Sequence, residues 1–213
     1  MAMKHPMSRH RRPLTLDEVK RLLAATHGYP DEALLIVALA TGLRRGELLA
    51  LRWSDLDVAQ GTLTVRRTLN REGYEAEPKT GRREMLLPGF LTPIFQQHRR
   101  LQDEARPVAG AEWQERDLVF ANATGGLLDP THLSRVVREV ASQAGVPSLS
   151  FHTLRQTTAS LLWDTLGYRH RARPHSQAVA QRREVAANLD ALFRSLLPEG
   201  HSGLPDAPSL SPQ

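Results

Sequence analysis

Apolar residues recur at helical spacing through most of the chain and alternate in one short central region. The first helical stripe consists of Val19, Leu22 and Leu23. Thr15 and Glu18 precede it at the spacing of a capping box, in which two side chains satisfy free backbone N–H groups at a helix start. The pattern therefore predicts a helix that begins at about residue 16.

A junction between two helices follows. The almost wholly apolar run 33–40 predicts a buried second helix that stops at Thr41-Gly42, where glycine permits a sharp reversal. A new apolar period starts at once and predicts a third helix that runs to about Trp53. Arg44 and Arg45 lie at its start, where the helix dipole favours anions. The pair fits a solvated turn, but a bound phosphate would also explain it, because helix-end N–H groups and a guanidinium can share one anion.

A small antiparallel sheet is predicted in the centre of the chain. Three short strands are expected, at 62–67, 74–77 and 84–87. The first strand alternates, with Leu63 and Val65 on its inward face. Thr80-Gly81 forms a turn before the last strand, and Lys79 beside this turn would reach outward.

Helical periodicity returns after the strands. Four more helices are expected, starting at Thr92-Pro93, Asp129-Pro130, Phe151 and about Ala178. Residues 106–116 look like a loop, and His98, on the apolar face of the helix before it, fits a partly buried structural histidine. The predicted fold class is mainly α with a small antiparallel β-sheet, that is, α+β.

Composition narrows the class of protein. With 213 residues, of which 40% are hydrophobic and 24% charged, the chain can form one packed domain with a short tail. It has no cysteine, which excludes disulfides, thiolate metal ligands and a cysteine nucleophile. No apolar run is long enough for a membrane span and residues 1–13 lack a signal-peptide core, so we expect no membrane partner and a cytoplasmic location.

The net charge of +5 is unevenly distributed. Basic residues cluster at 4–12, at 66–71 and 79–83 around the expected strands, and at 169–183. Such patches favour a polyanion partner such as nucleic acid, although basic runs also serve as plain solubilising surface.

Four basic residues stand out by their order and local context. They are Arg44 at a helix start, Lys79 at a hairpin turn, and His152 with Arg155 one helical turn later. With their neighbours they resemble the catalytic domain of the tyrosine recombinases, the phage integrase family. The resemblance rests on the segments 40–48, 51–57, 78–80, 117–120 and 151–155. It covers about residues 14–163 continuously and returns weakly over 175–197.

This resemblance implies a mechanism. In that family a tyrosine attacks a DNA phosphodiester and forms a phosphotyrosine link, with no metal or other cofactor. Arg44 and Arg155 would hold the non-bridging oxygens, a role that suits the planar and always charged guanidinium. Lys79 would protonate the leaving oxygen, and His152 would assist proton transfer. The partner would be double-stranded DNA, on which the chain would act as a homo-oligomer or beside an intact recombinase.

The nucleophile departs from the family pattern. Tyr168 follows soon after Arg155, whereas the family places its tyrosine much later, on a separate helix. The segment 174–177 is similar to the family's Gly-His-Ser turn, which would make His175 the late active-site histidine. Either the helix of the nucleophile is deleted, which we favour, or a shortened loop lets Tyr168 reach the site. Gln156 stands where the family often has histidine.

The expected organisation has three parts: a basic tail over 1–13, an integrase-type catalytic domain over 14–197 and a disordered tail over 198–213. Residues 165–181 of the domain look atypical and shortened. The resemblance implies a DNA recombination and integration domain of a mobile element, in a truncated copy with impaired activity. Without the family's core-binding domain, DNA affinity should be weak and salt-dependent. The alternative is a non-catalytic DNA-binding or accessory module derived from an integrase; a metal-dependent nuclease is disfavoured, because no carboxylates or histidines have ligand spacing.

Overall fold

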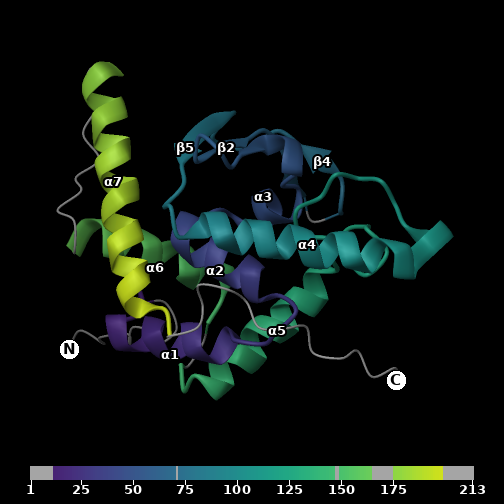
Figure 1. Cartoon of the computed structure of the whole chain (residues 1–213). Coiled ribbons are helices and arrows are strands. Elements are labelled where there is room, and N and C mark those ends of the chain that lie inside the picture. Colours follow the sequence, from purple (N-terminus) through teal and green to yellow (C-terminus); the bar gives the residue numbers. More distant parts are fainter. Residues whose placement is uncertain (1–11, 71, 147–148, 165–174, 199–213) are drawn as a thin grey trace, which may run out of the picture.

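The structure is a computed structural model, and it describes residues 12–70, 72–146, 149–164 and 175–198 (Figure 1). Its helices are α1 Leu16–Thr26, α2 Glu32–Thr41, α3 Arg45–Leu49, α4 Leu91–Ala109, α5 Pro130–Gln143, α6 Phe151–Asp164 and α7 His175–Leu196. Its strands are β1 Leu56–Asp57, β2 Thr62–Val65, β3 Thr68–Leu69, β4 Glu75–Ala76 and β5 Arg83–Leu86, and two 3-10 turns, η1 Trp53–Asp55 and η2 Gly110–Glu112, complete the elements. The α+β class is confirmed.

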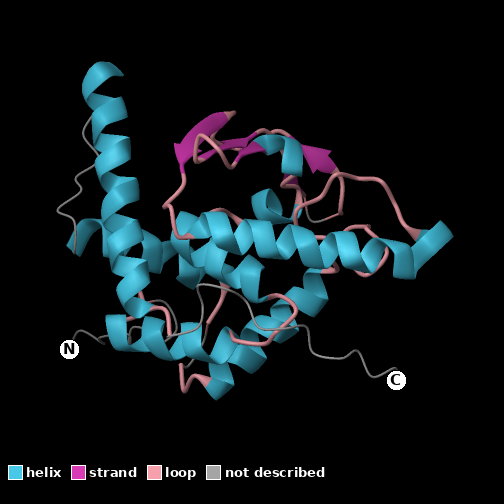
Figure 2. Cartoon of the chain, viewed as in Figure 1, coloured by secondary structure: helices cyan, strands magenta, loops and turns pink. Residues whose placement is uncertain are grey.

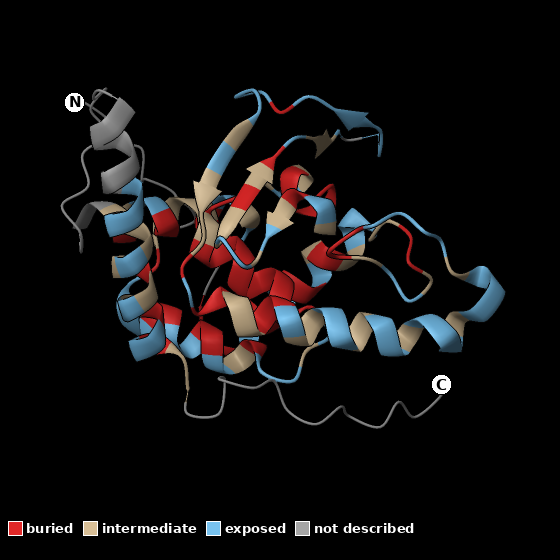
Figure 3. Ribbon diagram, turned by 45° about the horizontal axis from the view of Figure 1, so that its top comes forward, coloured by how far each residue is buried: buried red, intermediate tan, exposed pale blue. Residues whose placement is uncertain are grey.

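Helix α2 is the centre of the core. Every residue from Ala33 to Ala40 is buried, as expected for a helix that is apolar on all sides. It packs against α1, α3, α4 and most extensively α6, so buried positions concentrate in the middle of the molecule (Figure 3). The capping box at α1 is confirmed: the Thr15 hydroxyl accepts from the Glu18 N–H, and the Glu18 carboxylate accepts from the Thr15 N–H.

The strands form two separate sheets beside the helices (Figure 2). In the first, β2 lies between β1 and β5, all antiparallel, and Leu63 and Val65 are buried as predicted. The second is a short ribbon of β3 and β4. The predicted strand at 74–77 therefore pairs with β3 and not with the predicted strands at 62–67 and 84–87. The ribbon is held elsewhere, because β3 packs directly on α3.

The predicted ends of two helices were wrong. The third helix ends at Leu49 and not near Trp53, because the chain then becomes extended and pairs with a distant segment. The Trp53 N–H donates to the Asp117 carbonyl at 2.8 Å, and the Val119 N–H donates to the Leu51 carbonyl at 2.9 Å. Helix α4 continues through Pro107 to Ala109, so the segment expected to be a loop begins as helix. This last turn is exposed and projects beyond the core (Figure 3).

Helix α7 packs against α1 and β5 and begins three residues before the predicted start at Ala178. Leu189, Phe193 and Leu196 are buried, and the Phe193 ring stacks on Phe90 with centroids 4.9 Å apart. The Asp190 carboxylate accepts from the Phe90 N–H at 2.5 Å. Among the residues that the structure describes, no helix has both the length and the apolar character of a membrane span.

Candidate active site

Arg44 is placed by the turn between α2 and α3. Gly42 ends α2 in the left-handed conformation, with φ of 62°, and its N–H donates to the Ala38 carbonyl. The chain then reverses so that Arg44 becomes the N-cap of α3. The Glu47 carboxylate accepts from the Arg44 N–H at 2.9 Å and from Arg44 Nη1 at 3.0 Å. The side chain of Arg44 is therefore held at its base while remaining about a third exposed, at 37%.

Arg155 reaches the same turn from α6. Its Nη1 donates to the Gly42 carbonyl at 2.5 Å. The pKa of Arg155 lies below its ordinary value, first because the guanidinium is partly buried and then because the positive charges of Arg44 and Arg83 are close; Glu47 opposes this effect. Since a guanidinium stays charged at neutral pH, the structure gathers cations that repel one another. An anion at this point would relieve the repulsion.

Two residues of this cluster were not found from the sequence. Glu47 is 2% exposed, and Arg83 donates to both of its carboxylate oxygens, from Nη1 at 3.0 Å and from Nη2 at 2.7 Å. Burial on its own would raise the pKa of Glu47, but the hydrogen bonds from Arg83 and Arg44 prevail and lower it. Glu47 is therefore ionised. Its position three residues after the N-cap is a capping-box signal, whereas nothing local marks Arg83.

The turn that carries Lys79 lies beside Arg44. The Gly81 N–H donates to the Pro78 carbonyl at 2.8 Å, and Gly81 has a positive φ of 69°. The Thr80 hydroxyl accepts from Arg83 Nη1 at 3.0 Å and from Arg44 Nη1 at 3.4 Å. Lys79 itself is exposed, and within the described residues its ammonium makes no hydrogen bond or ion pair. It thus remains available to a ligand at the edge of the cluster.

His152 is exposed on the first turn of α6, one helical turn before Arg155. Ser150 caps this helix, because its hydroxyl accepts from the Thr153 N–H at 3.1 Å. His152 lines a cavity of about 340 Å³ together with Arg45, Ser134, Val137, Arg138, Leu149, Ser150 and Phe151. The structure thus brings Arg44 and Arg155 together, sets the Lys79 turn beside Arg44, and places His152 on the same helix as Arg155.

The side chains of the two remaining site candidates, Tyr168 and His175, are not placed. Tyr168 lies outside the described residues. The backbone of His175 begins α7, and its side chain is outside the description as well. The Gln156 side chain packs inward, and its Oε1 is buried with no hydrogen-bond partner in the described part of the chain. Among all the residues that the structure describes, no group of three histidine, aspartate or glutamate side chains is arranged to hold a metal ion.

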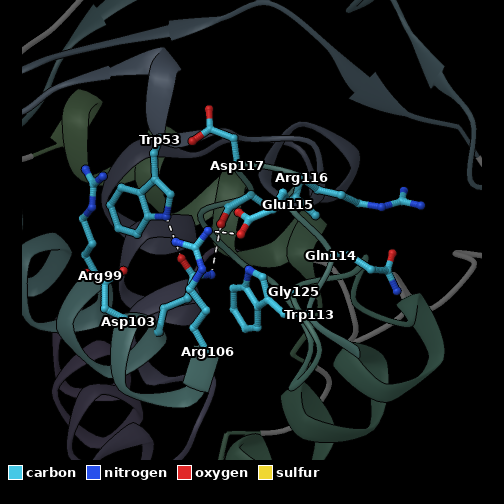
Figure 4. A pocket seen from close by; sticks show the side chains of 12 residues that line it. Trp53, Arg99, Asp103, Arg106, Trp113, Gln114, Glu115, Arg116, Asp117 and Gly125 are labelled. Atoms are coloured by element: carbon cyan, nitrogen blue, oxygen red, sulfur yellow. Dashed lines mark hydrogen bonds and ion pairs between the residues drawn. The ribbon is translucent and has the colours of Figure 1, made fainter. Parts of the chain in front are cut away.

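A second hollow lies between η1, α4 and the segment 113–118 (Figure 4). Trp53 Nε1 donates to Gln102 Oε1 at 2.7 Å, and the Arg99 guanidinium lies over the Trp53 ring, 5.2 Å from its centroid. Arg106 lies similarly over Trp113, at 6.0 Å. The side chains in these contacts fill much of the hollow, whose volume is about 90 Å³. None of the predicted site residues lines it. The candidate site is therefore the arginine cluster.

The fold and the cluster define an α+β domain with arginines gathered at one turn, and comparison with known proteins gives its family. The model of the phage integrase family matches residues 12–165, and the chain belongs to this family. It is 32% identical over 165 residues to a XerC-like tyrosine recombinase of Caldanaerobacter subterraneus subsp. tengcongensis, covering 70% of this chain and 42% of the relative. It is also 32% identical over 163 residues to an integrase of Streptomyces ambofaciens, covering 71% and 42%.

Solved structures support the fold. The crystal structure of XerA recombinase aligns with a TM-score of 0.58 and 22% identity, over 89% of this chain and 65% of that one. The Tn1549 transposon integrase, in complex with transposon right end DNA, aligns with a TM-score of 0.62 and 20% identity, over 87% and 68%. The chain spans less than half the length of the two relatives, at 42% of each.

Proposed function

We propose that the chain is a DNA-binding and strand-transfer domain for site-specific recombination, and that its arginine cluster binds one phosphodiester. The observation that carries this proposal is that Arg44 and Arg155 meet at the Gly42 turn, close enough for the charge of Arg44 to lower the pKa of Arg155. Two guanidinium groups from separate segments of the chain can hold the two non-bridging oxygens of a phosphate and stabilise the charge that builds there during transfer.

Lys79 and His152 complete the proposed site. Lys79 sits on a turn fixed to the cluster through Thr80, with its ammonium exposed, and so can deliver a proton to the leaving oxygen. His152 is exposed near the start of the helix that carries Arg155, and so can exchange a proton with a group bound at the cluster. The mechanism requires no metal or other cofactor.

The source of the nucleophile remains a proposal with two branches. If Tyr168 attacks the phosphorus, this chain forms the phosphotyrosine link itself. If the tyrosine helix is deleted, as we favour, the chain is a truncated copy with impaired activity that occupies DNA alone, as a homo-oligomer or beside an intact recombinase. The XerC-like and integrase relatives support a role in recombination and integration, and the transposon integrase supports an origin in a mobile element. We propose the cytoplasm as the location.

Retention of duplex DNA over a series of salt concentrations tests phosphodiester binding. We expect retention at low ionic strength that falls steeply as salt rises. The Arg44→Ala/Arg155→Ala variant should lose it, whereas the exposed control Arg100→Ala on α4 should retain DNA like the unmodified chain. Equal retention by all three proteins would contradict the proposed site.

Covalent trapping on nicked duplex DNA separates the two branches. A protein–DNA adduct that disappears in Tyr168→Phe would assign the nucleophile to this chain. Retention of DNA without any adduct would support the non-catalytic alternative, a DNA-binding or accessory module.

A further inference from the structure

Glu47 binds two arginines unequally. Arg83 meets both carboxylate oxygens with both of its Nη atoms, whereas Arg44 meets one oxygen through Nη1 alone. Within the described residues, the Nε and Nη2 atoms of Arg44 make no hydrogen bond. Arg44 therefore keeps most of its donors available, although it lies against a buried carboxylate.

The unequal sharing has a physical origin. A carboxylate buried as deeply as Glu47 needs a cation and hydrogen bonds to both oxygens, because an uncompensated buried charge is strongly unfavourable. An arginine fork supplies both bonds in one geometry. Arg83 can do this because it begins β5, and its pairing with Val65 fixes the backbone from which it reaches Glu47. Its side chain is 27% exposed, and among the described residues Glu47 is the carboxylate with which it forms an ion pair.

If Arg83 were absent, Arg44 would be the arginine that remains hydrogen-bonded to Glu47 among the described residues. Its Nη1 already touches Oε1, and its own backbone N–H is bound to Oε2, so a small rotation would close the bidentate pair. That pair would use the donors that an incoming phosphate needs. Thr80 would also lose its stronger contact, since Arg83 is the nearer of its two donors.

We infer that Arg83 is a positioning residue: it occupies the Glu47 carboxylate so that Arg44 stays available to an anion, and through Thr80 it ties the Lys79 turn to the same point. The inference rests on the proposed function, because it assigns Arg44 to phosphate binding. Arg83 is not expected to touch the phosphate. Arg83 acts by keeping Glu47 from pairing fully with Arg44.

The test follows the Arg44 Nε–H signal by NMR during titration with inorganic phosphate, in the full chain, with the signal assigned by its loss in Arg44→Lys. In Arg83→Gln the affinity reported by Arg44 should fall about tenfold. The matched control is Arg82→Gln, which removes the same charge from the neighbouring exposed position and should change the affinity less than twofold. Thermal unfolding, measured on each variant, shows that it is folded.

The same comparison in Glu47→Gln separates two effects of Arg83: its pairing with Glu47, and the electrostatic effect of its charge on phosphate. In Glu47→Gln no carboxylate can capture Arg44, so adding Arg83→Gln should change phosphate affinity less than twofold. A tenfold loss in both backgrounds would mean that Arg83 acts only through its charge, and the inference would be wrong. An unchanged affinity in folded Arg83→Gln would also overturn it.

Two further outcomes are decisive. If Arg83→Gln does not fold, Arg83→Lys takes its place: it keeps the charge but cannot form the fork, and a loss of about threefold is expected, whereas no loss would refute the inference. If the Arg44 signal in the unmodified chain ignores phosphate, the inference fails, while salt-sensitive DNA retention still judges the proposed function on its own.

Discussion

Gly46 is the point at which α3, the helix whose N-cap is Arg44, meets the β3–β4 ribbon. Gly46 does not have a positive φ, so conformational freedom is not what requires glycine here. Glycine is required because there is no space for a Cβ atom. A Cβ at this position would lie 2.5 Å from Thr68 Oγ1 and still closer to the Leu69 carbonyl oxygen. Because one of these neighbours is backbone, β3 would have to retreat by roughly 1 Å before the contact became tolerable.

We therefore predict that Gly46→Ala destabilises the protein, against the intrinsic preference of helices for alanine. That preference contributes at most about 1 kcal/mol in favour of alanine. Overpacking a tight contact costs about 1–3 kcal/mol. The expected net loss is about 1–2 kcal/mol, or a melting temperature lower by about 2–8 °C for a chain of this size.

Thermal unfolding followed by circular dichroism measures this loss, and DNA retention at low salt should fall with it because Arg44 is the N-cap of α3. The Gly46→Ala/Thr68→Ala variant is the control: it removes the hydroxyl but leaves the Leu69 carbonyl, so less than half of the stability should return. A Gly46→Ala protein that melts at or above the temperature of the unmodified chain would refute the reasoning.

Three further predictions concern other contacts. Arg155→Lys should weaken DNA retention about tenfold and reduce its salt dependence by less than one phosphate contact, because the charge stays while the planar fork that meets the Gly42 carbonyl is lost; equal retention would contradict this. The hydrogen bond from Arg12 holds the pKa of Glu18 down to about 2, although burial opposes it. The stability that ionised Glu18 contributes is therefore present above the ordinary carboxyl pKa and is lost as pH falls from about 4.5 to about 2. At neutral pH, Glu18→Gln should lower the free energy of unfolding by about 1 kcal/mol, given the exposure of Arg12. In acid unfolding, the variant should show less of the acid-dependent loss of stability. Asp190→Ala should lower the free energy of unfolding in urea by about 1–2 kcal/mol, because the Phe90 N–H loses its acceptor, whereas Glu184→Ala on the exposed part of α7 should leave it unchanged.

Local signals in the sequence predicted local structure well. The capping box placed the start of α1, and Asp129-Pro130 placed the start of α5, because both signals depend on residues within a turn of one another. The errors arose where contacts with a distant segment determine the local structure. The third helix ends at Leu49 since residues 117–119 bind the backbone that follows it, and the strand at 75–76 pairs with β3 because α3 holds that ribbon.

The same distinction applies to the site. Arg44, Lys79, His152 and Arg155 were singled out by their order and by a family resemblance, and their periodicity alone would not have joined them. Arg83 carries no local signal, because its partner Glu47 lies 36 residues earlier and the two meet only when β5 pairs with β2. Positioning residues of this kind become visible only once the strands are in register.

Gly42 shows why core packing and the site cannot be separated. Its left-handed conformation ends α2 and sends the chain to Arg44, while its carbonyl receives Arg155. A Cβ on Gly42 would stand 3.3 Å from the Thr158 side chain, whose hydroxyl donates to the Leu39 carbonyl, so α6 is in close contact with the end of α2 at this turn. The distance between the two arginines is therefore set by the packing of α2 on α6. A change buried in that interface should alter the proposed phosphate binding even when it touches neither guanidinium.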